Sequence, residues 1–366
     1  MFERRMFSHP DWALAAAVVA LAVIGVAMIY STTGDPTRGA ASLLYVTQMK
    51  AIAIGLAVLL ILLFIDYRTL ADNSHVIYLL LMAALLVVLL FGVTRGGARR
   101  WIPLGFYNLQ PSEFVKLGLA LVLAKYFAGI QRAVPDGKDL AIGGALTLVP
   151  LLLIARQPDL GTAVTLIPIF LAIAFLAGMR MRVVTVLLAI AIVTAPIAWR
   201  YALRDYQKSR ISTFLDPEQD PRGAGYQQIQ ARITVGSGGV WGKGFRKGTQ
   251  GQLRFLPVAH NDFVFSVLAE EQGLVGVLAA LGLYLVVMLR TLQAARLAKD
   301  RLGAYLVIGI LVGFGFQVFY NITMSAGLAP VKGLTLPLMS YGGSAMIASL
   351  AGFGLILNVR MRRFTN

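Results

Sequence analysis

The chain has 366 residues, of which 58% are hydrophobic and only 14% are charged, and its mean hydropathy is +0.74. A soluble protein carries about a quarter charged residues, so this composition excludes an ordinary soluble domain. The net charge of +16 does not indicate nucleic-acid binding, because the basic residues lie between apolar stretches and do not form basic modules. Cysteine is absent, which excludes disulfides, thiolate metal sites and cysteine nucleophiles.

Ten apolar stretches are predicted to cross a membrane as helices, because a span needs about twenty mostly apolar residues that satisfy their own backbone hydrogen bonds. The fifth and sixth are separated at Gln157-Pro158, since one continuous helix there would be too long and would contain a proline. The first has no small-residue cleavage site after it, so it is expected to remain as a helix. The ten stretches are residues 12–30, 45–65, 76–93, 114–129, 140–155, 160–178, 183–199, 263–289, 303–322 and 344–359.

These features predict an all-α polytopic membrane protein that forms one transmembrane domain over residues 1–366. Ten spans place both termini on one side, and the side richer in Lys and Arg in its short segments is predicted to be cytoplasmic. The richer set, which includes both termini, carries Arg4, Arg5, Arg68, Arg132, Lys138, Arg180, Arg182, Arg290, Arg296, Lys299, Arg301, Arg360, Arg362 and Arg363. The opposite short segments carry Arg38, Arg95, Arg99, Arg100, Arg156 and Lys332.

A long segment, residues 201–262, joins the seventh and eighth spans, and the topology places it outside the cell. A loop of this length largely escapes the positive-inside rule, so its basic residues do not contradict that placement. Its aromatic and aliphatic residues indicate a folded loop that lies on the membrane surface. These apolar residues are Phe214, Tyr226, Ile229, Ile233, Trp241, Phe255 and Leu256.

Ionisable residues inside the spans are expected to be functional, because burying a charge in hydrocarbon is costly. Glu113 and Lys116 lie three residues apart at the start of the fourth span and share a helix face. They form either a structural ion pair or part of a site. Gln110 and Ser112 precede them in an outer segment that is too polar for a simple connector, and Ser112 also suits a helix cap.

Two aspartates mark the outer ends of spans. Asp159 lies between the fifth and sixth spans, where aspartate commonly caps a helix. Asp262, at the outer end of the eighth span, is either a cap or a carboxylate placed to act as a general base. Glu270 and Glu271 lie deeper in the same span and cannot both face lipid, so at least one is expected to point into the bundle.

The glycine-rich segment 236–251 is not a nucleotide-binding P-loop. Ser237 stands where the first glycine belongs, and Gly244 follows Lys243 where serine or threonine is required. The glycines and cations of this segment either hold a diphosphate or rest on anionic lipid.

Two further patterns concern metals and helix packing. The three histidines are far apart in the sequence and no spacing typical of metal ligands occurs, so no metal site is predicted. Gly309 and Gly313 form a small-xxx-small pattern suited to close helix packing. That pattern indicates either packing inside the protein or an interface with the single helix of a partner.

Together these residues resemble the SEDS family of shape, elongation, division and sporulation proteins, and within it the RodA branch more than the FtsW branch. The resemblance covers essentially the whole chain, with one departure at Asn261, where a threonine is common. The matching motifs are QPSE at 110–113 with Lys116, QPDLGT at 157–162, DPEQDP at 216–221, GAGYQ at 223–227, GKG at 242–244, GTQ at 248–250, FLP at 255–257, HNDF at 260–263, AEE at 269–271 and PLMSYGGS at 337–344.

The resemblance implies a ten-helix peptidoglycan glycosyltransferase of the bacterial cytoplasmic membrane, which polymerises lipid II into glycan strands during cell elongation. It implies a class B penicillin-binding protein, a transpeptidase anchored by one helix, as the partner. The essential catalytic aspartate of the family corresponds to Asp262, in the large outer loop between the seventh and eighth spans.

On this hypothesis Asp262 deprotonates the 4-hydroxyl of the acceptor sugar while undecaprenyl diphosphate leaves the donor. The residues predicted to bind the substrate are Lys116, Arg210 and Lys243 at the leaving diphosphate, and Glu113, Gln110 and Asp159 around a polar cavity beneath the loop. A divalent cation, magnesium or manganese, is a further candidate for stabilising the diphosphate, although the sequence offers no closed metal site.

Two other functions fit a ten-helix protein with polar residues in its spans. One is a flippase or secondary transporter for lipid-linked precursors, although the spans show no obvious inverted repeat with matching broken helices. The other is a non-catalytic scaffold that recruits a penicillin-binding protein through Gly309 and Gly313. Both alternatives predict that the function survives the loss of Asp262.

Overall fold

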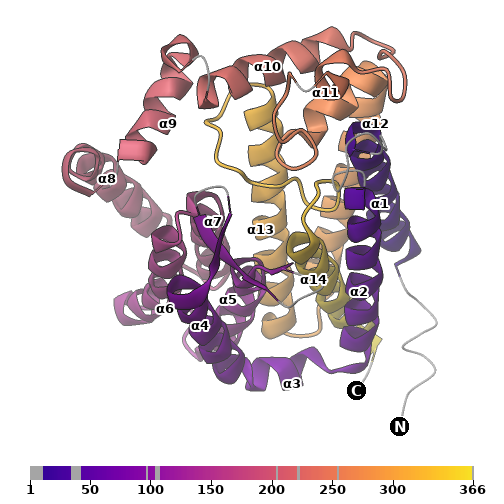
Figure 1. Cartoon of the computed structure of the whole chain (residues 1–366). Helices are drawn as coiled ribbons and strands as arrows, with labels where there is room; N and C mark the ends of the chain where they lie inside the picture. Colours follow the sequence, from indigo (N-terminus) through magenta and orange to yellow (C-terminus); the bar gives the residue numbers. More distant parts are fainter. Residues whose placement is uncertain are drawn as a thin grey trace.

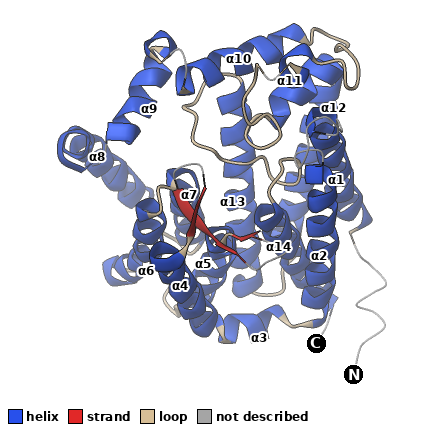
Figure 2. Ribbon diagram, in the orientation of Figure 1, coloured by secondary structure: helices blue, strands red, loops and turns tan. Residues whose placement is uncertain are grey.

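The computed structural model describes residues 11–33, 43–95, 98–103, 108–202, 205–220, 223–253 and 255–364. Most of this chain is helical, with one small sheet (Figure 2). The long helices are α1 Trp12–Thr33, α2 Leu44–Phe64, α4 Ser74–Phe91, α5 Pro111–Ala128, α6 Gly137–Arg156, α7 Leu160–Leu176, α8 Met181–Ile197, α12 Val264–Arg296, α13 Arg301–Ser325 and α14 Gly343–Met361. Shorter helices are α3 Tyr67–Asp72, α9 Asp205–Leu215, α10 Ala224–Ser237 and α11 Thr249–Gln252.

Each of the ten predicted spans overlaps one of these long helices, so the predicted all-α polytopic architecture is confirmed. Among the described residues, seven helices are long and apolar enough to cross a membrane: α1, α2, α4, α6, α12, α13 and α14. Helix α7 is shorter, and α5 carries Glu113, Lys116 and Lys125. The number of ten spans therefore remains a prediction.

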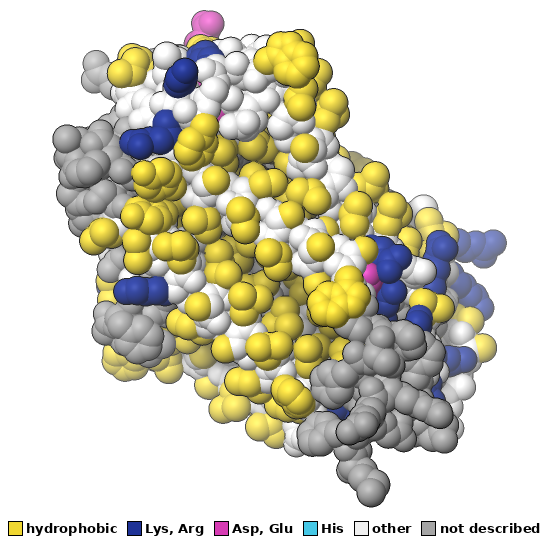
Figure 3. All heavy atoms as spheres, turned by 90° about the vertical axis from the view of Figure 1, so that its right-hand side faces the viewer, with side chains coloured by type: hydrophobic (Ala, Val, Ile, Leu, Met, Phe, Trp, Pro, Cys, Tyr) yellow, Lys and Arg dark blue, Asp and Glu magenta, His cyan; other side chains and the backbone are white. Residues whose placement is uncertain are grey.

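Helix α13 runs through the middle of the bundle and packs against α5, α7 and α12 (Figure 1). Helix α14 is buried along most of its length and packs against α2. The outer surface of the bundle is largely apolar on the face seen in Figure 3, with Lys and Arg side chains near its edges. An apolar exterior with charge confined to the edges is the pattern expected of helices that face lipid.

Ion pairs join the segments that the topology predicts to be cytoplasmic. They lie at the ends of α1, α2, α12, α13 and α14, which are far apart in the sequence but share one end of the bundle. The pairs are Arg290 with Asp11 at 2.8 Å, Arg360 with Asp11, Arg362 with Asp66 at 3.0 Å, and Arg68 with Asp300 at 2.9 Å. Helix α3 lies at the end of the bundle opposite to α10 and α11 (Figure 1), so the structure separates the predicted inner and outer segments.

A small antiparallel sheet lies between α4 and α5. Its strands are β1 Val93–Arg95, β2 Ala98–Pro103 and β3 Asn108–Leu109. Strand β2 pairs with both neighbours, and Ile102 lies opposite Leu109. The sheet carries Arg100 on its central strand and leads directly into Gln110, the residue before α5.

The long loop between α8 and α12 is folded. It contains α9, α10 and α11, and α10 packs against α12 and α13. The sequence predicted a folded loop from its apolar residues, and these helices agree with that prediction. Its location outside the cell remains a prediction.

Helix α12 is interrupted at Gly273, whose φ and ψ are 64° and −163°. Residues 239–244 of the long loop insert at this break, and their backbone groups replace the lost helical hydrogen bonds. The bonds are Lys243 N to Glu270 O at 2.9 Å, Gly244 N to Glu271 O at 2.9 Å, Leu274 N to Gly239 O at 3.0 Å and Val275 N to Val240 O at 3.2 Å. The loop and the first half of α12 therefore form one hydrogen-bonded unit.

Replacing Gly273 or Gly242 with alanine is expected to lower the apparent unfolding temperature of the protein in detergent. A Cβ atom would lie 2.3 Å from Gly242 N in the first case and 2.3 Å from Glu271 O in the second, and both glycines have positive φ. Gly282→Ala is the matched control, because nothing lies within 4 Å of its Cβ position in the same helix. Equal unfolding temperatures for all three variants would contradict the inserted-loop geometry.

Candidate functional site

Asp262 lies where the long loop meets α12. The main-chain carbonyl of Asp262 accepts a hydrogen bond of 2.8 Å from the side-chain amide of Asn321 on α13. The same amide donates to the carbonyl of Leu334 at 2.7 Å. Asn321 is completely buried. One side chain therefore joins the backbone at Asp262 to α13 and to the segment between α13 and α14.

That segment, residues 327–342, runs beside the Asp262 side chain. A Cβ atom built on Gly333, whose φ is +67°, would lie 3.6 Å from a carboxyl oxygen of Asp262. A few residues farther along, the backbone amide of Tyr341 donates to the carbonyl of His260 at 2.9 Å. The HNDF and PLMSYGGS motifs, about 80 residues apart in the chain, thus form one local structure.

Asp159 caps α7, since its carboxylate accepts a hydrogen bond of 3.3 Å from the backbone amide of Thr162. The other carboxylate oxygen accepts from the side-chain amide of Gln110 at 3.1 Å and from Ser112 Oγ at 3.4 Å. Arg100 Nη1 lies 3.7 Å from Asp159, whose side chain is only 2% exposed. The capping role and the site role considered for Asp159 are therefore compatible, and Gln110 belongs to the same cluster.

The electrostatic environment of the Asp262 carboxyl group combines opposing effects. The pKa of Asp262 is raised to about 6, and burial is the largest cause. The positive charges of Arg100 and Arg210 oppose this rise in the pKa, and the negative charge of Asp159 adds to it. With a pKa of about 6, Asp262 is mostly ionised at neutral pH yet is a stronger base than an ordinary aspartate. Arg210 and Asp159, both predicted from the sequence, thus lie within electrostatic reach of Asp262.

Arg100, Asn321 and Lys332 were not among the predicted site residues. Arg100 and Lys332 were recognised only as basic residues of the short segments used to assign topology. Asn321 lies in an apolar span and carries no charge, so no sequence signal distinguished it from an ordinary polar residue in a helix. All three reach Asp262 or its neighbours through contacts between distant segments.

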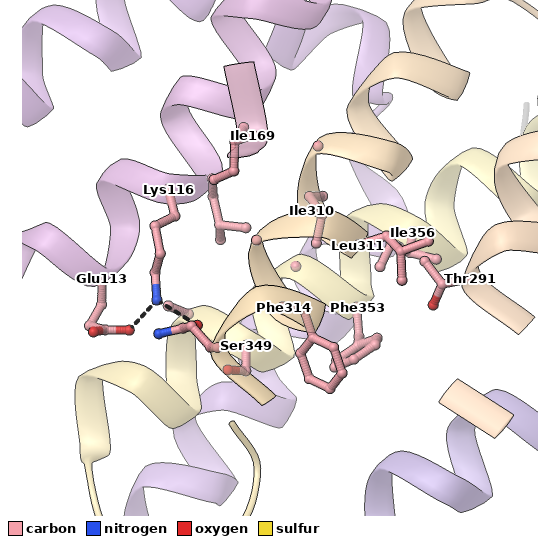
Figure 4. Close-up of a pocket in the computed structure, with 16 residues that line it drawn as sticks. Glu113, Lys116, Ile169, Thr291, Ile310, Leu311, Phe314, Ser349, Phe353 and Ile356 are labelled. Atoms are coloured by element: carbon pink, nitrogen blue, oxygen red, sulfur yellow. Dashed lines mark hydrogen bonds and ion pairs between the residues drawn. The ribbon is translucent and has the colours of Figure 1, made fainter. Parts of the chain in front are cut away.

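Glu113 and Lys116 form an ion pair inside the bundle. Lys116 Nζ lies 2.7 Å from Glu113 and donates to Gln317 Oε1 on α13 at 3.0 Å (Figure 4). The pair borders a small cavity of about 40 Å³ that is otherwise largely apolar and includes Phe314 and Phe353. Within the part of the chain that the structure describes, neither Glu113 nor Lys116 forms a hydrogen bond or ion pair with Asp262.

Lys243 is engaged by Glu270 on α12, at 2.7 Å. Its ammonium group also donates to Ser237 at 3.0 Å and to Thr249 at 2.9 Å. Lys243 therefore fastens the glycine-rich part of the loop to α12. Glu270 and Glu271 are both buried, which confirms that they do not both face lipid, and Glu271 accepts a hydrogen bond from Ser31 on α1.

Gly309 and Gly313 lie at contacts inside the bundle. A Cβ atom on Gly309 would meet Ile173 on α7 at 2.8 Å and Ala120 on α5 at 3.0 Å, and one on Gly313 would meet Ile169 at 3.0 Å. Both glycines are buried. These contacts favour the packing alternative, because the glycines allow α13 to approach α5 and α7. An interface with the single helix of a partner stays a prediction.

The described residues contain no group of three or more His, Asp or Glu side chains arranged to hold a metal ion. The candidate site consists instead of one carboxylate, Asp262, with nearby cations and the capped Asp159 cluster.

Asn321→Leu is expected to lower the apparent unfolding temperature, because the substitution leaves the buried carbonyls of Asp262 and Leu334 without their donor. Each unsatisfied buried group typically costs about 1–3 kcal/mol. Asn73→Leu is the control, since the Asn73 side chain donates to Thr69 O at the surface. Thermal unfolding in detergent measures both, and an unchanged value for Asn321→Leu would contradict the bridging role.

Three comparisons with known proteins agree with this architecture. The model of the FtsW/RodA/SpoVE family of cell cycle proteins matches residues 12–364. Peptidoglycan glycosyltransferase MrdB of Escherichia coli is 38% identical over 97% of this chain and 94% of its own length. Peptidoglycan glycosyltransferase RodA of Treponema pallidum is 31% identical over 98% of this chain and 99% of its own length.

Solved structures share the fold. One chain of a peptidoglycan synthase complex that coordinates polymerization and crosslinking has a TM-score of 0.85 and is 34% identical over 98% of this chain and 100% of that chain. The rod shape determining protein RodA of Thermus thermophilus has a TM-score of 0.73 and is 32% identical over 98% of this chain and 99% of that chain. These matches extend over nearly the full length of this chain and of each relative, so the chain belongs to the FtsW/RodA/SpoVE family.

Proposed function

We propose that Asp262 is the general base with which this chain, a multi-pass peptidoglycan glycosyltransferase, joins lipid II molecules into glycan strands. The observation that carries this proposal is a partly buried carboxyl group with a pKa of about 6, beside two arginines, where the long loop meets α12. Relatives at 38% and 31% identity over nearly the whole chain are named peptidoglycan glycosyltransferases, which supports the same activity.

In the proposed step, Asp262 takes the proton of the 4-hydroxyl group of the acceptor sugar. The hydroxyl oxygen forms a bond to the anomeric carbon of the donor, and the bond from that carbon to the diphosphate oxygen breaks. The electron pair leaves with undecaprenyl diphosphate. A positioned general base typically contributes roughly 10²–10⁴-fold to the rate.

Cations at the site have the complementary task of stabilising the leaving diphosphate. Arg210 lies near enough to Asp262 to affect its pKa, which supports its predicted role. Preorganised donors at a developing charge are commonly worth about 3–4 kcal/mol each. Lys116 and Lys243 were predicted for the same task, and their direct contact with the substrate stays a prediction, since Glu113 and Glu270 engage their ammonium groups.

The Asp159 cluster is proposed to orient the site. Asp159 holds both Gln110 and Arg100, so it fixes an amide and a guanidinium group near the catalytic carboxyl group. Glu113 is proposed to hold Lys116 toward the polar end of the cavity between α5 and α13.

The proposed setting is the bacterial cytoplasmic membrane, with both termini in the cytoplasm and Asp262 outside. The separation of the basic inner segments from the long loop supports this orientation. The proposed partner is a class B penicillin-binding protein anchored by one helix. A structural relative is part of a complex that coordinates polymerization and crosslinking, which supports a crosslinking partner.

Purified wild-type protein, with its cognate class B penicillin-binding protein, is expected to produce glycan ladders from lipid II in detergent. Asp262→Ala and Asp262→Asn are expected to lose at least 10²-fold in rate, because they remove the base. Asp205→Asn, at an exposed carboxylate of the same loop, is the matched control and should polymerise normally.

The Asp262 variants should keep their unfolding temperature at pH 7.5. Burial raises the pKa of Asp262, so the ionised form is disfavoured by folding and a neutral side chain there is tolerated or stabilising. Normal polymerisation by folded Asp262→Ala would refute the general-base assignment. If Asp262→Ala still translocated lipid-linked precursors, that result would favour the alternative function of a flippase or secondary transporter.

A further inference from the structure

Lys332 is a basic residue held near the catalytic aspartate. It lies in the segment between α13 and α14, and its ammonium group is 5.5 Å from the centre of the Tyr320 ring. The Tyr320 hydroxyl donates to the carbonyl of Pro330 at 2.8 Å, which fixes the ring against this segment. A cation over an aromatic face is stabilised by about 0.5–2 kcal/mol but keeps its positive charge.

The backbone around Lys332 is anchored on the site. The adjacent Gly333 is the residue whose Cβ position lies 3.6 Å from the Asp262 carboxyl group, and the carbonyl of Leu334 is held by Asn321. On the other side, the carbonyl of Lys332 lies 3.1 Å from the Cβ position of Gly161, in the first turn of α7. Lys332 therefore has little freedom to move away from the site.

Arg210 brings a second positive charge to the same place. Burial lowers the pKa of Lys332, and the positive charge of Arg210 lowers it further, so the two positive charges lie within electrostatic reach of each other. Arg210 also acts on the Asp262 carboxyl group from α9 of the long loop. Arg210 therefore lies within electrostatic reach of both Lys332 and Asp262.

Arg210 and Lys332 differ from the other basic residues of the site because neither forms an ion pair within the described part of the chain. Lys116, Lys243 and Arg100 each lie within 4 Å of a carboxylate. Two partly buried positive charges that repel each other are unfavourable, so this arrangement favours the binding of an anionic ligand.

We propose that Lys332 and Arg210 together bind the diphosphate group of the lipid-linked donor, and that Lys332 is a substrate-binding residue of the enzyme. This inference rests on the function proposed above, because a diphosphate is the anion that this reaction brings to Asp262. When the anomeric carbon–oxygen bond breaks, the new negative charge on the diphosphate oxygen falls between an ammonium and a guanidinium group. The proton from the acceptor stays on Asp262.

Direct binding of undecaprenyl diphosphate, the leaving product, tests this inference without requiring turnover. Lys332→Met is expected to weaken binding by about tenfold, as for the loss of one charge-assisted contact. Lys332→Arg should restore most of it, because the positive charge is kept. Lys138→Met is the control, since Lys138 is an exposed lysine in the first turn of α6, outside both the site and the glycine-rich segment.

Undecaprenyl monophosphate serves as the second probe, and Lys332→Met should weaken its binding less than that of the diphosphate. Equal affinity of wild type and Lys332→Met for the diphosphate would overturn the inference. So would equal weakening by Lys138→Met, because the effect would then be one of general surface charge.

Amine labelling of the wild-type protein provides a test that needs no folded variant. Undecaprenyl diphosphate should slow the acylation of Lys332 but not of the exposed Lys138, as measured by mass spectrometry of peptides. Unchanged labelling of Lys332 at saturating diphosphate would contradict the inference. Protection of Lys332 in a protein that fails to polymerise lipid II would support the diphosphate site and contradict the proposed function, so the two failures are distinguishable.

Discussion

A helix in hydrocarbon must satisfy its own backbone hydrogen bonds, and this constraint places the polar residues of the candidate site at helix ends. Gln110 precedes α5, Asp159 caps α7, Asp262 lies just before α12, and Ser344 is in the first turn of α14. The ends of α5 and α14 are joined by a hydrogen bond of 2.8 Å from Gln110 N to Ser344 Oγ. The N-terminal ends of these helices carry partial positive charge, which suits a site for anionic substrates.

The pKa of Asp262 results from several opposing effects, and no single neighbour determines it. Burial alone would disfavour the carboxylate, and two arginines compensate for part of that cost. Asp159 has two opposite effects on the pKa of Asp262. Its own negative charge raises that pKa, and it holds Arg100, whose positive charge lowers it. The result is a base that is ionised near neutral pH without being fully neutralised by an ion pair.

The sequence predicted the helices well because each span is a run of about twenty adjacent, mostly apolar residues. The predicted break at Gln157-Pro158 separates α6 from α7 in the structure. Local patterns also identified Asp262, Asp159 and Gln110. Helix spacing placed Glu113 beside Lys116, and their distance of 2.7 Å agrees.

What the sequence could not provide were contacts between distant segments. Lys243 resembled a phosphate ligand, but its nearest carboxylate comes from Glu270, 27 residues later, across the break in α12. Gly309 and Gly313 have the same pattern whether they face a partner or an inner helix, and only the contacts of α13 with α5 and α7 favour the inner helix. Lys332 became a candidate for substrate binding because of its relation to Tyr320, Arg210 and Asp262 in the structure. The sequence around Lys332 does not indicate that these residues are its neighbours.

The pH dependence of kcat/KM for lipid II polymerisation tests the central claim most directly, because it reports the ionisation of the base in the free enzyme. Asp262 must be ionised to accept a proton, so the account predicts that activity falls with decreasing pH through about 6. In Arg210→Gln the loss of a positive charge should raise the pKa of Asp262 and move this acidic limb to higher pH, whereas the exposed-loop variant Lys247→Gln should leave it in place. An acidic limb near pH 4, the ordinary value for aspartate, or one that does not move in Arg210→Gln, would contradict the account.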